Sequence, residues 1–223
     1  MSRISHLNFW PNRKVARLLA VVFMLVLVAL ILPRNTQATG ADTFQISFKG
    51  QSANASFFST DASGCVGTFV SIFANDGSFK ETGMPKTVES GASIFIDQFD
   101  SCTQTSILFG VGIVTLAADE FQIDKKLDSA MLNTTIEVFD FVSNTSIPID
   151  ITLNWTGIGG SFRSKGHFQA MTPGFKVNSH FDGTQRNAEA SATVTDGTTN
   201  FTPEPAFADL ASNNTGEVRI THF

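Results

Sequence analysis

The sequence is short of several residue types that binding proteins and enzymes commonly use. Of its 223 residues, two are cysteines and none is tyrosine. Basic residues are also scarce, because five of the 15 Lys and Arg fall within residues 1–38, where there is no acid. The rest of the chain therefore carries ten basic residues against all 20 acids, a formal charge of −10. A nucleic-acid-binding protein needs an excess of Lys and Arg to displace phosphate counterions, so we expect no nucleic-acid partner.

The aromatic residues are almost all phenylalanine. There are 22 Phe, and the only tryptophan beyond the N-terminal segment is Trp155. Phenylalanine fills a core but lacks the polar group by which Tyr and Trp hold a ligand. Trp155 is in phase with Ile151 and Leu153 at every second position, which favours a place in the core. The side chains that carbohydrate-binding modules usually present are therefore missing.

Motifs of the common catalytic sites are absent. The chain has no Gly-x-Ser-x-Gly, no His-Glu-x-x-His, no phosphate-binding loop and no dinucleotide-binding glycine pattern. These motifs place nucleophiles, metal ligands or phosphate-binding amides. The glycines at 157–160 separate two strand-like segments and indicate a hairpin loop. We expect a non-catalytic protein, and the alternative is an enzyme whose site leaves no local motif.

An apolar segment lies near the N-terminus. Basic residues end at Arg17, and Leu18–Leu32 are fifteen uncharged, mostly aliphatic residues before Pro33. As a helix they would rise about 22 Å, less than the roughly 30 Å of a bilayer core. Residues 1–38 are therefore predicted to be a signal peptide with a cleavage site after Ala38. The alternative is an uncleaved anchor at residues 18–32, with no other membrane insertion; both predict export.

Cys65 and Cys102 are the only cysteines. In an exported protein we expect them to form a structural disulfide. The same pattern of strand, cysteine-bearing turn and strand surrounds each one, 37 residues apart, which would bring both turns to one end of the fold.

Beyond residue 42, apolar and polar residues alternate with a period of two. Residues 147–155 and 188–194 are the clearest examples. This alternation is typical of strands with one face in a core. With turn signals such as Asp182-Gly183, it predicts an all-β fold: a single antiparallel β-sandwich, jelly-roll-like, or a closed β-barrel domain over residues 39–223. Asn200–Asn214 is predicted to be a long connection before the last strand.

A hairpin over residues 162–184 brings two histidines together. Phe at even positions of the first strand and odd positions of the second predicts that these faces point inward, which leaves the histidines outward. A turn at Pro173-Gly174 then pairs His167 with His180. Opposed Cβ atoms stand about 4.5–5.5 Å apart, so one Zn²⁺ or Cu²⁺ could bridge the imidazoles. The pair could instead gain charge as the pH falls through about 6.5. His222 is the candidate for a third ligand.

Other surface residues suggest two further kinds of binding site. Cations around the histidines could form an anion- or partner-binding face: Arg163, Lys165, Lys176 and Arg186. Oxygen ligands for Ca²⁺ could come from Asp97 with Asp100, or from Asp196 with Asn200, although neither pair has EF-hand spacing. No cofactor is expected apart from such a metal ion. The sequence thus predicts an exported β-protein of binding or interaction type with an extracellular ligand or surface as its partner; a hydrolytic or isomerising enzyme is the alternative.

Overall fold

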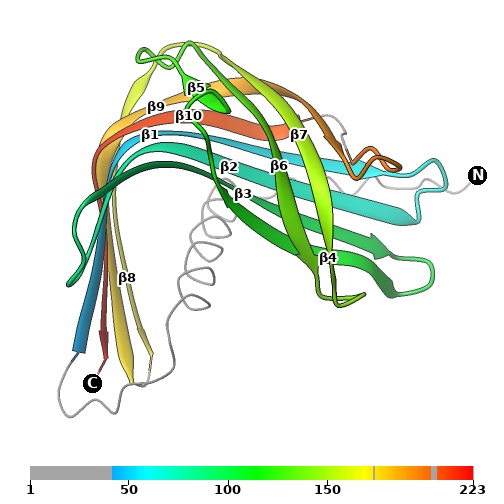
Figure 1. The fold of residues 1–223 in the computed structure, drawn as a ribbon, viewed down its shortest axis with the longest axis horizontal. Coiled ribbons are helices and arrows are strands. Elements are labelled where there is room, and N and C mark those ends of the chain that lie inside the picture. The colour runs from blue at the N-terminus through cyan, green and yellow to red at the C-terminus, as the bar shows by residue number, and fades with distance from the viewer. Residues whose placement is uncertain (1–41, 173, 202–204, 223) are drawn as a thin grey trace, which may run out of the picture. The chain divides into compact units, whose positions relative to one another are not determined.

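The computed structural model describes residues 42–172, 174–201 and 205–222, and they form ten strands that pair antiparallel throughout (Figure 1). The expected all-β fold is confirmed. In these ranges no helix is long and apolar enough to cross a membrane. The predicted signal segment, residues 1–38, lies outside them. The strands are β1 Asp42–Thr60, β2 Val66–Glu81, β3 Thr87–Asp100, β4 Thr105–Thr115, β5 Phe121–Ile123, β6 Ser129–Asp140, β7 Thr145–Gly157, β8 Phe162–Thr172, β9 Phe175–Thr195 and β10 Pro205–His222.

The sheet closes on itself. Its strand order is β10-β1-β2-β3-β4-β6-β7-β9-β8, and β9 also pairs with β10. Pairing between β4 and β6 covers three residue pairs, beginning with Gly110 opposite Asp140. A Cβ at Gly112 would lie 2.6 Å from Ile136 Cγ2 and 2.7 Å from the Glu137 carbonyl oxygen. Glycine is therefore required for β4 to approach β6 this closely, and we call this junction the β4–β6 seam.

The core lies inside the closed part of the sheet, by which we mean the part where β4 pairs with β6 and β7 pairs with β9. On β6 and β7 every second residue is buried, as the alternation predicts. Trp155 is 1% exposed, and its indole N–H donates to the carbonyl oxygen of Asn54 at 2.9 Å. Its expected role in the core is confirmed. The largest fully buried side chains are Trp155, Phe57, Ile72, Ile94, Ile96, Leu127, Leu132, Ile136, Ile149, Ile151, Leu153 and Leu210.

The predicted disulfide is present. Cys65 and Cys102 are bonded, with 5.3 Å between their Cα atoms. Cys65 lies in the β1–β2 turn and Cys102 in the β3–β4 turn. The bond therefore joins two hairpins that are neighbours in the sheet.

Five strands continue beyond the closed part. Along β9, residues 188–195 pair with β7, whereas residues 175–185 pair with β8 on one side and β10 on the other. Next to them lie residues 212–222 of β10, 42–50 of β1 and 77–81 of β2. We call these segments, together with β8, the extension; β8 and the neighbouring strand ends are seen at the lower left of Figure 1.

The face of the sheet that is apolar in the closed part is polar in the extension. On β9 the even positions Ala188, Ala190 and Val194 are buried in the core. Because alternation along β9 is unbroken, His180 and Lys176 lie on the same face as these residues. The sheet no longer closes there, so this face carries exposed polar side chains.

The phenylalanines of the extension correct one prediction. They share one face, as expected, but Phe162 is 42%, Phe175 38% and Phe181 39% exposed. The prediction that this face packs in the core is therefore wrong. On this face Val177 and Ile220, which are direct neighbours on β9 and β10, are buried at 3% and 7% exposed. The physical reason is that the core is on the opposite face of the same strands, where the sheet closes.

The predicted connection at Asn200–Asn214 is also wrong in large part. Strand β10 begins at Pro205, and Ala208 and Leu210 are buried opposite β1. Residues 202–204 are not among those the structure describes. Proline is tolerated as the first residue of a strand. The polar residues at 212–214 interrupt the alternation, so the short apolar pattern before them does not by itself predict a strand.

Candidate functional site

The predicted hairpin register is present in the extension. His167 of β8 is paired with His180 of β9, Lys165 with Asp182, and Gln169 with Asn178. The turn contains Gly174 at a φ of 91°, a left-handed conformation that glycine adopts without strain. The two histidines are thus direct cross-strand neighbours, and both are exposed.

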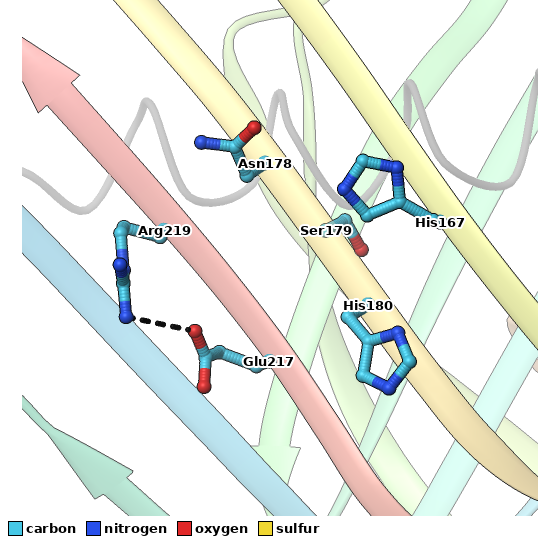
Figure 2. Close-up of a pocket in the computed structure, with 6 residues that line it drawn as sticks. All are labelled: His167, Asn178, Ser179, His180, Glu217 and Arg219. Carbon is cyan, nitrogen blue, oxygen red and sulfur yellow. Dashed lines mark ion pairs between the residues drawn. The ribbon is translucent and has the colours of Figure 1, made fainter.

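A third potential metal ligand lies on the next strand. Glu217 of β10 is paired with His180, so His167, His180 and Glu217 form one line across three strands. We call these three residues the His–His–Glu row. Figure 2 shows their side chains projecting from neighbouring strands over a shallow hollow. The hollow measures about 170 Å³ and is lined by His167, Asn178, Ser179, His180, Glu217 and Arg219.

The charge on Glu217 is compensated by Arg219. The guanidinium Nη2 lies 3.3 Å from Glu217 Oε1 and also donates to Gln45 Oε1 at 3.3 Å. Neither His167 nor His180 has a hydrogen bond or ion pair with another described residue. The imidazole nitrogens are therefore free to bind a metal ion.

The three ligands of the row do not yet converge. Within the described ranges, the only group of three ligand atoms within 4.8 Å of one another is at Cys65, Asp100 and Cys102, where both sulfurs belong to the disulfide. In the row, the Glu217 carboxylate is turned toward Arg219. Since exposed side chains change rotamer within nanoseconds, a metal ion could draw the three ligands together without a change in the backbone.

His222, the candidate from sequence for a third ligand, lies elsewhere. It is paired with Phe175, and the two rings are 6.1 Å apart. Phe175 precedes His180 by five positions on β9, which at about 3.4 Å per residue is roughly 17 Å. Glu217, which the sequence analysis missed, occupies the position opposite His180.

The four cations of the proposed anion-binding face have different environments. Arg163 and Lys165 both pair with Asp182, at 2.9 and 3.1 Å. Hydrogen bonding from Arg163, aided by Lys165 and by both positive charges, lowers the pKa of Asp182 to about 2. Arg186 pairs with Asp128. Among the described residues, only Lys176 of the four has no ion pair. The other three pair with two carboxylates, which offset half of the four positive charges.

The aspartates considered for Ca²⁺ mostly support turns. Asp100 accepts the backbone N–H groups of Cys102 and Thr103 at 2.8 and 3.0 Å. Asp196 accepts those of Thr198 and Thr199, and these hydrogen bonds lower its pKa. Carboxylates used in this way stabilise loops without a metal ion. Asp97 differs from both, because none of the described residues forms a hydrogen bond or ion pair with its side chain.

Comparison with known proteins gives no relative, since no family model, no curated protein and no solved structure matches the chain.

Proposed function

We propose that this chain is an exported, non-catalytic binding protein that binds Zn²⁺ or Cu²⁺ through His167, His180 and Glu217. The observation that carries the proposal is the position of these three residues directly opposite one another on β8, β9 and β10. Export is supported by the N-terminal segment and by the disulfide, which persists in an oxidising compartment.

The chemistry of the row suits these ions. Zinc and copper prefer neutral imidazole nitrogen, and zinc also accepts carboxylate oxygen at about 2.0–2.2 Å. His180 is central, so its imidazole can share one ion with His167 on one side and Glu217 on the other. The cost of freeing Glu217 is small, because the Glu217–Arg219 pair is 39% and 47% exposed and such surface pairs contribute at most about 1 kcal/mol.

A metal-dependent hydrolase is the second candidate, favoured by the same ligand set. Two imidazoles and one carboxylate leave the fourth zinc position for water, as in catalytic zinc sites. The exposure of both histidines would let a substrate approach. This candidate requires metal binding by the row, so it is tested only after binding is established.

Thermal unfolding of the purified full-length protein tests metal binding. A ligand at about 100 times its Kd adds about 2.7 kcal/mol to the free energy of unfolding, which corresponds to a rise in Tm of roughly 5–10 °C. We expect this rise with Zn²⁺ or Cu²⁺ relative to EDTA. His167→Ala/His180→Ala should abolish it and Glu217→Gln should reduce it, whereas the matched control His222→Ala should leave it unchanged.

Two results would refute the proposal: no metal-dependent shift in the wild-type protein, or a shift that survives in His167→Ala/His180→Ala. A Ca²⁺-specific shift would instead direct attention to the aspartate-bearing loops. For the hydrolase, the zinc-loaded protein should cleave a chromogenic ester and Glu217→Gln should lower this activity. Zinc binding without any hydrolysis would leave the binding role alone.

A further inference from the structure

A second hollow lies on the outer face of the closed part, away from the histidines. It measures about 290 Å³ and is lined by Phe58, Thr60, Gly64, Cys65, Gly67, Phe69, Asp97, Phe99 and Ser101. Three of these residues are phenylalanines on three neighbouring strands, and the one titratable side chain in the lining is Asp97. This hollow is independent of the proposed metal site.

The sheet register explains how the hollow forms. Phe58, Phe69 and Asp97 are directly opposed on β1, β2 and β3. In the next row on the same face, Gly67 lies between Thr60 and Phe99. A Cβ at Gly67 would meet the Phe58 ring at 3.9 Å and the Phe99 carbonyl oxygen at 3.9 Å. The missing side chain at Gly67 therefore leaves open space between aromatic walls.

Asp97 is an unusual residue for such a place. Its direct neighbours on β2 and β4 are Phe69 and Phe109, and none of the described residues forms a hydrogen bond or ion pair with it. Partial burial among apolar groups raises the pKa of its carboxyl group. An acid that loses hydration here without gaining a partner is costly to the folded state, and a cation in the hollow would remove that cost.

The end of the hollow is held firmly. The disulfide joins its lining residue Cys65 to Cys102, and Ser101 donates from both its N–H and its hydroxyl to the Cys65 carbonyl oxygen, each at 2.9 Å. Asp61 Oδ1 accepts the N–H groups of Cys65 and Val66, each at 3.0 Å. The turn that borders the hollow is thus fixed before any ligand arrives, which limits the ordering cost of binding.

We propose that this hollow binds a quaternary or multiply methylated ammonium group, with the Phe58, Phe69 and Phe99 rings around the cation and the Asp97 carboxylate as its counter-charge. Aromatic faces attract such cations within about 6 Å of the ring centre. A methylated ammonium has few or no N–H groups to satisfy, which suits walls of phenylalanine that offer no hydrogen-bond acceptor. The single carboxylate matches the single charge.

Binding of choline to the full-length protein tests the proposal. Backbone amide NMR should show saturable shifts at Gly64 and Gly67 with choline chloride but not with sodium chloride of equal ionic strength. The uncharged isostere 3,3-dimethylbutan-1-ol should bind about tenfold more weakly, since it lacks the attraction to the rings and to the carboxylate. Asp97→Asn and Phe58→Leu should each weaken choline binding by a similar factor.

Matched controls separate local effects from general ones. Glu189→Gln on β9 removes one negative charge outside the hollow, and Phe162→Leu on β8 replaces an exposed aromatic ring elsewhere. Neither variant should change the affinity for choline. Melting curves would show that all four variants are folded. The proposal is overturned if the uncharged isostere binds as tightly as choline, if Asp97→Asn and Phe58→Leu bind choline normally, or if choline produces no shifts at Gly64 and Gly67.

Discussion

Asp140 provides the sharpest test of how the sheet closes. It is 5% exposed and lies at the β4–β6 seam, where only three residue pairs join the strands. Its Oδ1 accepts the N–H groups of Phe109 at 3.2 Å and Val142 at 2.9 Å. Its Oδ2 accepts the N–H of Ser143 at 3.1 Å and the Ser143 hydroxyl at 2.6 Å. One carboxylate thus connects β4, the end of β6 and the turn that follows.

The Asp140→Asn variant keeps the shape and removes the charge. The remaining amide oxygen still accepts two N–H groups, and the Ser143 hydroxyl can turn to accept from the amide NH₂. The Ser143 N–H faces that NH₂, which cannot accept it, so this bond is lost. Hydrogen bonds to charged groups contribute about 1.5–3 kcal/mol each, and neutral ones about 1. One lost bond and two weakened ones therefore cost about 3 kcal/mol, which for a domain of this size lowers Tm by roughly 6–12 °C.

The effect should depend on pH in a defined direction. Burial acts to raise the pKa of Asp140, but hydrogen bonds from Ser143, Val142 and Phe109 outweigh it, so the folded-state pKa lies below the ordinary 3.8. The stability that this carboxylate contributes is present above that value and is lost as the pH falls through the folded pKa. The difference between the wild type and Asp140→Asn should therefore shrink in acid.

Urea unfolding at neutral pH and in acid measures this difference. The control is Asp150→Asn, an exposed aspartate whose carboxylate accepts one hydrogen bond, from the Thr135 hydroxyl at 2.6 Å. Surface changes of this kind usually lie within about 0.5 kcal/mol. If Asp140→Asn costs no more than Asp150→Asn at neutral pH, or if its cost persists unchanged in acid, the reasoning about the seam is wrong.

Three further changes test other parts of the structure. Cys65→Ser/Cys102→Ser opens a loop of 37 residues and should reduce the free energy of unfolding by about 4 kcal/mol, a Tm loss of roughly 10 °C that an unchanged melting curve would contradict. Gly112→Ala should cost about 1–3 kcal/mol in urea unfolding, because its Cβ would meet β6 at 2.6–2.7 Å, and a neutral result would mean that the seam can widen freely. Asp97→Asn should raise Tm at neutral pH and have no effect in acid. Desolvation raises the pKa of Asp97 in the folded state, so stability that is present at low pH is lost as the pH rises through this pKa. A lower Tm of the variant at neutral pH would show that the carboxylate has a partner.

The hairpin register could be predicted because it depends on local information. Alternation assigns each residue of β8 and β9 to a face, and the turn position then fixes which residues oppose one another. These rules predict that His167 lies opposite His180, and the structure has the same pairing. The disulfide could also be predicted from the sequence, because two cysteines allow only one pairing.

Glu217 could not be found in this way. Its position opposite His180 depends on β10 lying beside β9, a pairing between distant parts of the sequence that alternation does not specify. The register also shifts between Asn213 and Thr215, where β10 gains one residue relative to β9. A bulge of this kind reverses the faces of all the side chains that follow it, so alternation counted from the buried Leu210 would place Glu217 on the wrong face.

Alternation distinguishes the two faces of a strand, but it does not tell which face is inside. On β9 the sequence pattern over residues 175–181 places apolar residues at odd positions, and over 188–194 at even positions. The strand is continuous, so both segments share one set of faces, and the core is set by where β7 pairs with β9. Beyond that pairing, the face that holds Ala188 and Val194 continues as the polar surface that carries His180. The sheet can therefore present side chains in a fixed register there without giving up core contacts, which is why we propose the metal site in the extension.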